Sequence, residues 1–276
     1  MTIPTKPLND GHAIPAIGLG TYGLRGTAGV AAVVSALDTG YRLLDTALNY
    51  ENEREVGEGV RESGVSRADV IVTTKLPGRH HGFDETLASF DVSLRNLGLD
   101  YVDLYLIHWP LPRVGKFVDS WRAMIQLRER GLVRSIGVSN FTPDHIRRLI
   151  EATDVTPAVN QIELHPRFPQ AAQREFHAEH GIVTESWSPL ARRKKLTGEP
   201  IVLRIAEAHG VTATQVVLRW HIQLGAVPIP KSADEGRQRE NFDVFGFELT
   251  QDELASISSL ESGRLWGGDP ETHEEF

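Results

Sequence analysis

The sequence of 276 residues contains no cysteine and no long hydrophobic run. Without cysteine the chain cannot form disulfides, thiolate metal sites or cysteine nucleophiles, so histidine and carboxylates remain as the metal ligands to consider. No apolar segment approaches the ~20 residues that span a bilayer. The first residues, MTIPTKPLNDG, also lack the basic and apolar regions of a signal peptide. We therefore expect a cytoplasmic protein with no membrane partner.

Positive charge is also scarce. The chain has 29 Lys and Arg residues against 37 Asp and Glu residues, which gives a formal net charge of -8. Surfaces that bind nucleic acids or anionic membranes need an excess of basic residues to displace counterions. We therefore expect no nucleic-acid partner, and any bound anion requires a local basic cluster.

Short β-branched runs alternate with longer amphipathic segments along the whole chain, a pattern typical of βαβ units around a parallel sheet. The eight runs cover residues 16–20, 41–45, 70–75, 102–108, 133–139, 158–163, 182–187 and 226–231. Eight strand-helix pairs in a chain of this length favour a closed barrel over an open doubly wound sheet. The predicted fold is α/β, a (β/α)8 TIM barrel in which residues 1–276 form a single domain.

Local signals support this assignment. Segments 83–97 and 212–224 carry apolar residues at three- and four-residue spacing, and Thr142 precedes Pro143 as a helix cap. Glycines stand where helices are expected to end, at Gly64, Gly98, Gly131 and Gly210. Residues 6–8 and 12–14 flank a tight-turn sequence and predict a hairpin that closes the bottom of the barrel. After Ser262 the polar, glycine-rich end of the chain either folds over the barrel mouth or frays.

Four residues whose side chains could take part in catalysis lie at or just after the ends of three neighbouring strands, where barrel enzymes carry their catalytic groups: Asp45, Tyr50, Lys75 and His108. An adjacent ammonium stabilises a phenolate, so Lys75 is expected to lower the pKa of Tyr50, and Asp45 is expected to keep Lys75 charged. His108 could then orient a carbonyl oxygen while Tyr50 protonates it. Taken singly, each residue has an ordinary structural explanation, such as a cap, a solvated charge or core packing. The combination on one rim is far more specific.

The chain resembles the aldo-keto reductases from end to end. The resemblance is carried by GYRLLDTALNYENEREVG, VTTKL, LDYVDLYLIHWP, VRSIGVSNF, PAVNQIELHP and IPKSADEGRQRENFDVFGFEL. It is most similar to the bacterial branch that includes 2,5-diketogluconate reductases. The resemblance implies a catalytic tetrad at Asp45, Tyr50, Lys75 and His108, NADPH as cofactor, and a monomer. It also implies that the substrate is a small carbonyl compound, namely an aldehyde, ketoaldehyde, dicarbonyl or keto-sugar.

Two regions are candidates for the dinucleotide. Residues 18–23, GLGTYG, have G-x-G-x-x-G spacing, but no helix opens directly after them, so we interpret them as a turn. Two cations and a hydroxyl follow the last strand, where barrels commonly bind phosphate. The resemblance assigns Lys231, Ser232 and Arg237 to the adenosine 2′-phosphate, with Glu240 and Asn241 near the adenine. A solvated basic turn is the structural alternative for this cluster.

The nicotinamide end requires hydrogen-bonding groups for a carboxamide and a flat surface for the ring. The strand ends offer Ser139, Asn140 and Gln161 for the amide and Trp187 for stacking. The resemblance adds pyrophosphate contacts over residues 188–190, which include Ser188 and Leu190, and further cofactor contacts at Thr21, Tyr22 and Asp45. The substrate pocket is expected to be formed by Tyr22, Asn49, His108 and Trp109.

No metal is expected, because protonation comes from Tyr50, and neither His80-His81 nor the Glu163-x-His165 run has a third convincing ligand. Three rival functions remain. A Schiff-base enzyme would use Lys75 as a neutral amine, which Asp45 disfavours. An open Rossmann dehydrogenase would need Gly20 at the pyrophosphate. A noncatalytic NADPH-binding sensor or accessory subunit would keep the cofactor site and lack turnover.

Overall fold

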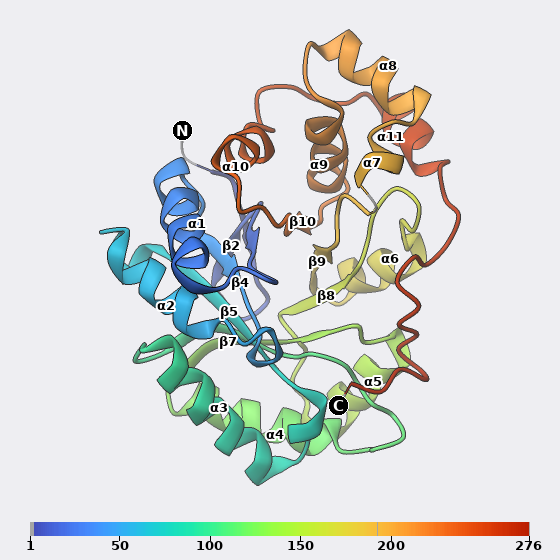
Figure 1. Ribbon diagram of the computed structural model, residues 1–276. Helices are drawn as coiled ribbons and strands as arrows, with labels where there is room; N and C mark the ends of the chain where they lie inside the picture. Colours follow the sequence, from blue (N-terminus) through green and yellow to red (C-terminus); the bar gives the residue numbers. More distant parts are fainter. Residues whose placement is uncertain (1–2, 192, 276) are drawn as a thin grey trace.

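The computed structural model describes residues 3–191 and 193–275, and its centre is an eight-stranded parallel sheet in which the strands follow one another in sequence order (Figure 1). The strands are β3 (Leu19–Gly20), β4 (Leu43–Asp45), β5 (Ile71–Leu76), β6 (Val102–Ile107), β7 (Val133–Ser139), β8 (Val159–Glu163), β9 (Val183–Trp187) and β10 (Val227–Pro228). Seven of the eight predicted strand segments contain one of them, and β5 extends one residue beyond the predicted segment 70–75.

The sheet closes because the residues around β10 return to β3. Gly20 N donates to Pro230 O at 3.1 Å, and Gly20 also forms a parallel bridge with Lys231. A Cβ atom at residue 20 would lie 3.1 Å from the carbonyl oxygen of Ile229, so glycine allows this close approach. The predicted (β/α)8 barrel is confirmed.

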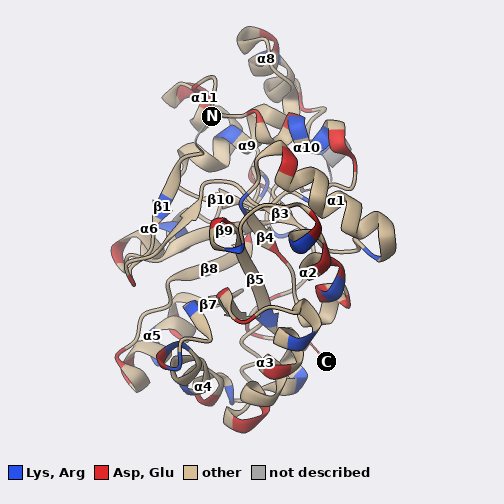
Figure 2. Cartoon of the chain, turned by 90° about the vertical axis from the view of Figure 1, so that its left-hand side faces the viewer, with Lys and Arg blue, Asp and Glu red and all other residues tan. Residues whose placement is uncertain are grey.

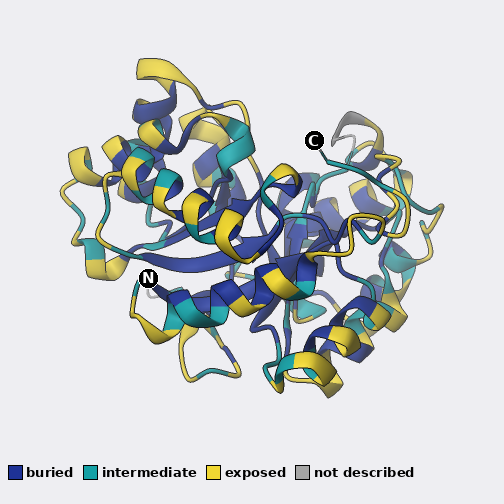
Figure 3. Ribbon diagram, turned by 90° about the horizontal axis from the view of Figure 1, so that it is seen from below, coloured by how far each residue is buried: buried dark blue, intermediate teal, exposed yellow. Residues whose placement is uncertain are grey.

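Helices surround the strands, and Figure 3 shows their outer faces exposed and their inner faces buried. The α-helices are α1 (Gly26–Thr39), α2 (Glu53–Glu62), α3 (Phe83–Leu97), α4 (Phe117–Glu129), α5 (Pro143–Thr153), α6 (Ala171–Glu179), α7 (Arg193–Leu196), α8 (Pro200–His209), α9 (Ala213–Gln223), α10 (Glu235–Phe242) and α11 (Gln251–Ser258). Short 3-10 helices are η1 (Leu48–Tyr50), η2 (Arg67–Asp69) and η3 (Gly78–His80).

The predicted hairpin is present and consists of β1 (Thr5–Pro7) and β2 (Ala13–Pro15). Its Leu8 and Ile14 belong to the same buried cluster as Leu43 and Leu104 from barrel strands. This cluster fills the lower interior and leaves the opposite end for polar groups. The hairpin therefore closes the bottom of the barrel, as predicted.

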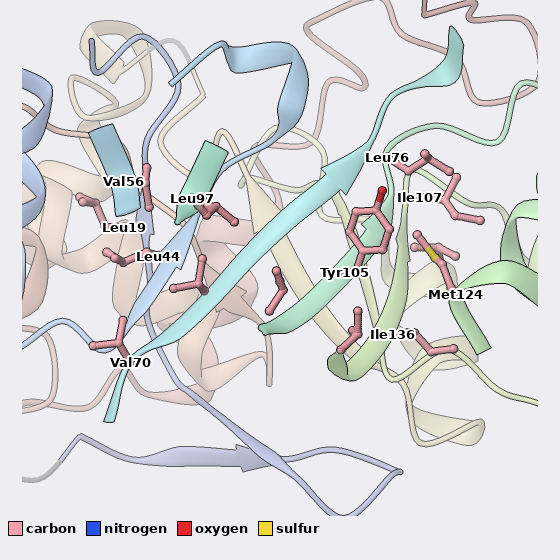
Figure 4. Packing of buried hydrophobic residues seen from close by; sticks show 14 of the residues in the cluster. Leu19, Leu44, Val56, Val70, Leu76, Leu97, Tyr105, Ile107, Met124 and Ile136 are labelled. Atoms are coloured by element: carbon pink, nitrogen blue, oxygen red, sulfur yellow. The ribbon is translucent and has the colours of Figure 1, made fainter. Parts of the chain in front are cut away.

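A second core lies between strands and helices. Figure 4 shows Leu44 and Ile136 from strands facing Val56, Leu97 and Met124 from helices. All five side chains are fully buried, and burying a residue of this kind contributes about 1.5–3 kcal/mol. This apolar layer fixes the strands on which the polar end of the barrel depends.

The local signals in the sequence are also confirmed. Helix α3 has the predicted bounds, Thr142 caps α5 in a capping box, and Thr212 caps α9 in the same way. Gly98 and Gly210 end their helices with positive φ values of 62° and 65°, a conformation that glycine adopts without strain.

Charged residues lie mostly on the helices and loops around the strands (Figure 2). Within residues 3–191 and 193–275, no single helix is long and apolar enough to cross a membrane. Helices α8 and α9 reach that length and composition as a pair, but a bend of 91° separates them.

Candidate active site

The polar end of the barrel follows from the alternation of side chains along each strand. Asp45 comes two residues after Leu43, and His108 two residues after Leu106. Residues two apart point to the same face of a strand, so both polar side chains point into the barrel, as the two leucines do. Lys75 lies on the intervening strand, β5, which pairs with both β4 and β6. Three strand ends thus bring Asp45, Lys75 and His108 to one rim.

Lys75 and Asp45 form a buried ion pair. The Lys75 Nζ lies 2.7 Å from both Asp45 carboxylate oxygens and donates to Thr46 O at 2.9 Å. The lysine side chain is fully buried. Burial alone would lower the pKa of Lys75, but Asp45, Tyr50 and Glu185 together outweigh it and the pKa is raised. Lys75 is therefore an ammonium ion at neutral pH.

Tyr50 ends η1 and places its ring beside this pair. The Lys75 Nζ lies 5.0 Å from the ring centroid, and the rings of Tyr22 and His108 are 5.1 Å and 5.9 Å away. Burial raises the pKa of Tyr50, while Lys75 acts to lower it. The net direction is upward, so the lowering expected from the sequence is wrong for this structure, because burial outweighs the contribution of Lys75.

Glu185 is a buried acid that sequence analysis missed. Gln161 Nε2 donates to Asp45 Oδ2 at 2.8 Å and to Glu185 Oε2 at 2.9 Å, so the amide joins the two carboxyl groups. Burial and the nearby Asp45 raise the pKa of Glu185 to about 8. The available signal was its position two residues before Trp187, which puts both side chains on the inward face of β9.

Asn140 forms the centre of a fixed wall. Its backbone has a φ of 63°, its Nδ2 donates to His108 O and to Ser139 Oγ, each at 3.0 Å, and its Oδ1 accepts from Trp187 Nε1 at 2.8 Å. Ser139 Oγ in turn donates to Gln161 O at 2.8 Å. The residues proposed for the nicotinamide end thus hold one another in place.

A cavity of about 500 Å³ opens over these groups and extends to Lys231. Twelve of the predicted residues line it: Thr21, Tyr22, Asp45, Tyr50, His108, Trp109, Asn140, Gln161, Trp187, Ser188, Leu190 and Lys231. Pro189, within the predicted segment 188–190, also lines it. Sequence analysis did not select four further lining residues: Gly20, Ala191, Ile229 and Pro230. The predicted residues outside the lining are Asn49, Lys75, Ser139, Ser232, Arg237, Glu240 and Asn241.

The basic cluster lies at one end of this cavity. Lys231 and Arg237 are exposed, and Asp234 caps α10 by accepting from Arg237 N at 2.8 Å. Ser232 is buried, whereas Asn241 Oδ1 is buried without a hydrogen-bond partner in the described part of the chain. Glu240 accepts from Thr212 Oγ1 at 2.8 Å. Exposed cations beside a helix N-terminus are suited to a phosphate group.

The glycine-rich segment is a turn. Helix α1 begins at Gly26, after Arg25, and does not open on Gly23. Thr21 Oγ1 instead donates to Asp45 O at 2.9 Å, which ties this turn to the strand carrying the catalytic candidate. The segment lines the cavity through Gly20, Thr21 and Tyr22.

The C-terminal segment packs along the barrel mouth and does not fray. Figure 1 shows it passing α6 and ending near α5. Leu265 N donates to Glu163 Oε1 at 2.7 Å, and the His273 ring lies 4.1 Å from that of Trp109. Asn49, expected at the substrate, donates through Nδ2 to Glu275 Oε1 at 2.7 Å. Sequence analysis did not identify Glu275, and no local pattern pointed to it.

The pair His80-His81 and the run Glu163-x-His165, considered as metal ligands, lie in ordinary structural settings. Burial lowers the pKa of His81 to about 4, and His165 Nε2 lies 3.0 Å from Glu163 Oε1 inside the core. Among residues 3–191 and 193–275 there is no group of three or more His, Cys, Asp and Glu residues that could hold a metal ion.

The closed barrel, the buried ion pair and the cavity above it define an α/β-barrel enzyme. The model of the Aldo/keto reductase family matches residues 16–262, and the chain belongs to this family. It is 64% identical over 274 residues to 2,5-diketo-D-gluconic acid reductase B of Corynebacterium sp. (strain SHS752001), with 99% of each chain covered.

Solved structures agree with this assignment. The crystal structure of an aldo/keto reductase from Brucella melitensis has a TM-score of 0.91 and 49% identity, covering 94% of this chain and 100% of that one. A mutant of Gox0644 in complex with NADPH has a TM-score of 0.94 and 43% identity, covering 99% and 100%. The family resemblance seen in the sequence is confirmed.

Proposed function

We propose that this protein is an NADPH-dependent carbonyl reductase in which Tyr50 protonates the substrate oxygen. Family membership and the diketogluconate reductase relative support carbonyl reduction by an oxidoreductase, and the NADPH complex of Gox0644 supports the cofactor. The observation that carries the role of Tyr50 is the buried Lys75 ammonium 5.0 Å from its ring.

The residues of this chain account for the proton. As the Tyr50 O–H bond breaks, a new O–H bond forms on the substrate oxygen, and the phenolate left behind is stabilised by Lys75. Asp45 keeps Lys75 charged, and solvent returns the proton to Tyr50 after the step. NADPH, when bound, supplies the hydride to the carbonyl carbon.

The residues present fit that cofactor. Lys231, Ser232 and Arg237 offer charge and a hydroxyl to the 2′-phosphate, and the orphaned Oδ1 of Asn241 offers an acceptor to the adenine amine. At the other end of the cavity the amides and hydroxyl of the Asn140 wall are suited to a carboxamide, and Trp187 to stacking. Thr21, Ser188, Leu190 and Glu240 complete the proposed contacts.

The substrate is placed between aromatic walls. His108 lines the cavity beside Tyr50, where it can donate to the carbonyl oxygen, and Tyr22 and Trp109 flank the opening. Few polar side chains surround the position of the carbonyl group, so the site suits aldehydes, ketoaldehydes, dicarbonyls and keto-sugars. We propose a protein that works as a single barrel domain and as a monomer.

The test is NADPH oxidation with methylglyoxal and phenylglyoxal, followed by absorbance, for the wild type and Tyr50→Phe. Loss of the general acid should lower kcat by about 10²- to 10⁴-fold. NADPH binding, measured separately by tryptophan fluorescence, should stay unchanged. Wild-type binding without turnover on any carbonyl compound would favour the noncatalytic sensor, and unchanged turnover of Tyr50→Phe would refute the role of Tyr50.

A further inference from the structure

Glu185 is a fully buried acid that the proposed proton transfer does not use. It lies on β9, directly opposite Gln161 on the paired strand β8. Its Oε2 accepts from Gln161 Nε2 at 2.9 Å, and the same Nε2 donates to Asp45 Oδ2 at 2.8 Å. One amide nitrogen is thus held between carboxyl groups from two other strands.

The two hydrogen bonds determine which way the Gln161 amide faces. Nε2 carries two hydrogens, and both are used, so it has none left to donate. The reverse orientation would place the amide oxygen against the carboxylate of Asp45, and two acceptors repel each other. Gln161 lines the cavity, and its Oε1 has no hydrogen-bond partner in the described part of the chain. The amide therefore offers the cavity an acceptor and no donor.

We propose that Glu185 is a positioning residue that holds the Gln161 amide with its oxygen towards the cavity, where Oε1 accepts from the NH2 of the cofactor carboxamide. This inference rests on the proposed NADPH site, in which Gln161 belongs to the nicotinamide end. An amide oxygen accepts from an NH2 group and not from a carbonyl oxygen. The fixed amide thus distinguishes a carboxamide from a group of the same shape that lacks NH2.

Asp45 alone would hold the amide incompletely. Without Glu185, the second N–H of the buried Gln161 side chain would lose its acceptor, and a buried donor without a partner is unfavourable. The amide would then turn about its hydrogen bond to Asp45 until this N–H faces the cavity. Oε1 would no longer be the single polar group that the amide presents there.

Glu185 suits this role as a neutral acid. Its Oε2 accepts from Gln161, so the proton of the neutral form lies on Oε1, which is buried without a hydrogen-bond partner among the described residues. A charged oxygen in this place would have no donor, which costs more than an O–H group without an acceptor. Burial and the nearby Asp45 raise the pKa of Glu185 to about 8, although Gln161 and Lys75 act to lower it. At pH 7 Glu185 therefore accepts from the amide without adding a second negative charge.

The test measures binding and does not depend on turnover. Tryptophan fluorescence titrations give the Kd of NADP⁺ and of its 3-acetylpyridine analogue, in which a methyl group replaces the NH2 and the carbonyl oxygen is kept. The wild type should bind the analogue about 3- to 10-fold more weakly than NADP⁺, as expected for the loss of one hydrogen bond. In Glu185→Met, which has a similar length and no acceptor, the ratio of the two Kd values should fall to within about twofold of one.

Matched variants separate positioning from a general disturbance of the barrel. Glu185→Gln keeps an acceptor oxygen in the shape of the neutral acid and should restore the wild-type ratio. Glu53 is the control, because it is another buried acid and accepts from Thr74 Oγ1 at 2.7 Å and Asn96 Nδ2 at 3.0 Å, outside the cavity lining. Glu53→Met should therefore leave the ratio unchanged, even where it lowers stability.

A wild-type ratio in Glu185→Met would overturn the role of Glu185, and a ratio near one in the wild type would overturn the orientation of Gln161. Circular dichroism shows whether Glu185→Met folds, and Glu185→Leu takes its place if it does not. Wild-type binding of NADP⁺ without turnover on any carbonyl compound would instead refute the proposed reduction, while the ratios would still decide the role of Glu185.

Discussion

Replacing Lys75 by Met tests the buried pair directly, because Met has a similar length and no charge. The change leaves the Asp45 carboxylate, only 6% exposed, with Gln161 as its remaining side-chain donor among the residues that the structure describes. Breaking a buried pair in this way costs about 3–5 kcal/mol in the free energy of unfolding. The double variant Lys75→Met/Asp45→Asn buries no charge, so its loss should be smaller than the sum of the two single losses by about 2 kcal/mol or more.

Urea unfolding at pH 7, followed by the fluorescence of the five tryptophans, measures these losses. Arg122→Met is the matched control, because the Arg122–Asp119 pair is 2.9 Å long but 49% and 52% exposed. Exposed pairs contribute only about 0–1 kcal/mol. A loss for Lys75→Met no larger than that for Arg122→Met, or strict additivity in the double variant, would refute the reasoning.

Three further predictions concern the cofactor, a buried acid and the tail. Arg237→Ala should weaken binding of NADPH much more than of NADH in fluorescence titrations, and equal losses would contradict the phosphate assignment. Glu185 has a raised pKa, so the folded state holds its proton and stability falls as pH rises from about 4.5 towards 8. Glu185→Gln should remove that fall. In urea unfolding, the difference in the free energy of unfolding between the two proteins should change by roughly 4 kcal/mol over this pH range, and a constant difference would contradict the prediction. Gly78→Ala should displace the tail from the barrel rim, so limited proteolysis should cut the tail faster than in the wild type, and an unchanged rate of cleavage would argue against the close approach.

Much of the fold was predictable from the sequence because its signals are local. The stripe along Phe83–Leu97 defines a helix by spacing alone, and Thr142 and Thr212 cap helices through hydrogen bonds three residues away. The strand ends that carry Asp45 and Lys75 were predictable for a related reason. In a closed parallel barrel all carboxyl ends meet at one rim, so the order of the strands is enough to bring their last residues together.

The remaining features depend on contacts that no local pattern contains. The direction of the pKa of Tyr50 results from a competition between burial and Lys75, and the depth of burial is known only once the loop after β4 is in place. Glu275 lies 167 positions after His108 in the chain, and their contact requires two glycines, at 78 and 268, to admit the tail. Glu185 is the intermediate case, because its inward position follows from strand alternation.

Tyr50 and His108, the two groups proposed to face the substrate, are supported from opposite sides and with different strength. Behind Tyr50 stands a pair of charges that is almost completely buried, so added salt hardly screens it. Behind His108 stands Glu275, which retains 13% exposure and lies on a segment held by contacts at the surface of the barrel. The proposed proton donor, Tyr50, is thus held by the rigid core, whereas His108, proposed to orient the carbonyl, contacts the docked C-terminal segment. Conditions that loosen the tail should therefore reduce turnover before they affect the Lys75–Asp45 pair or the fold.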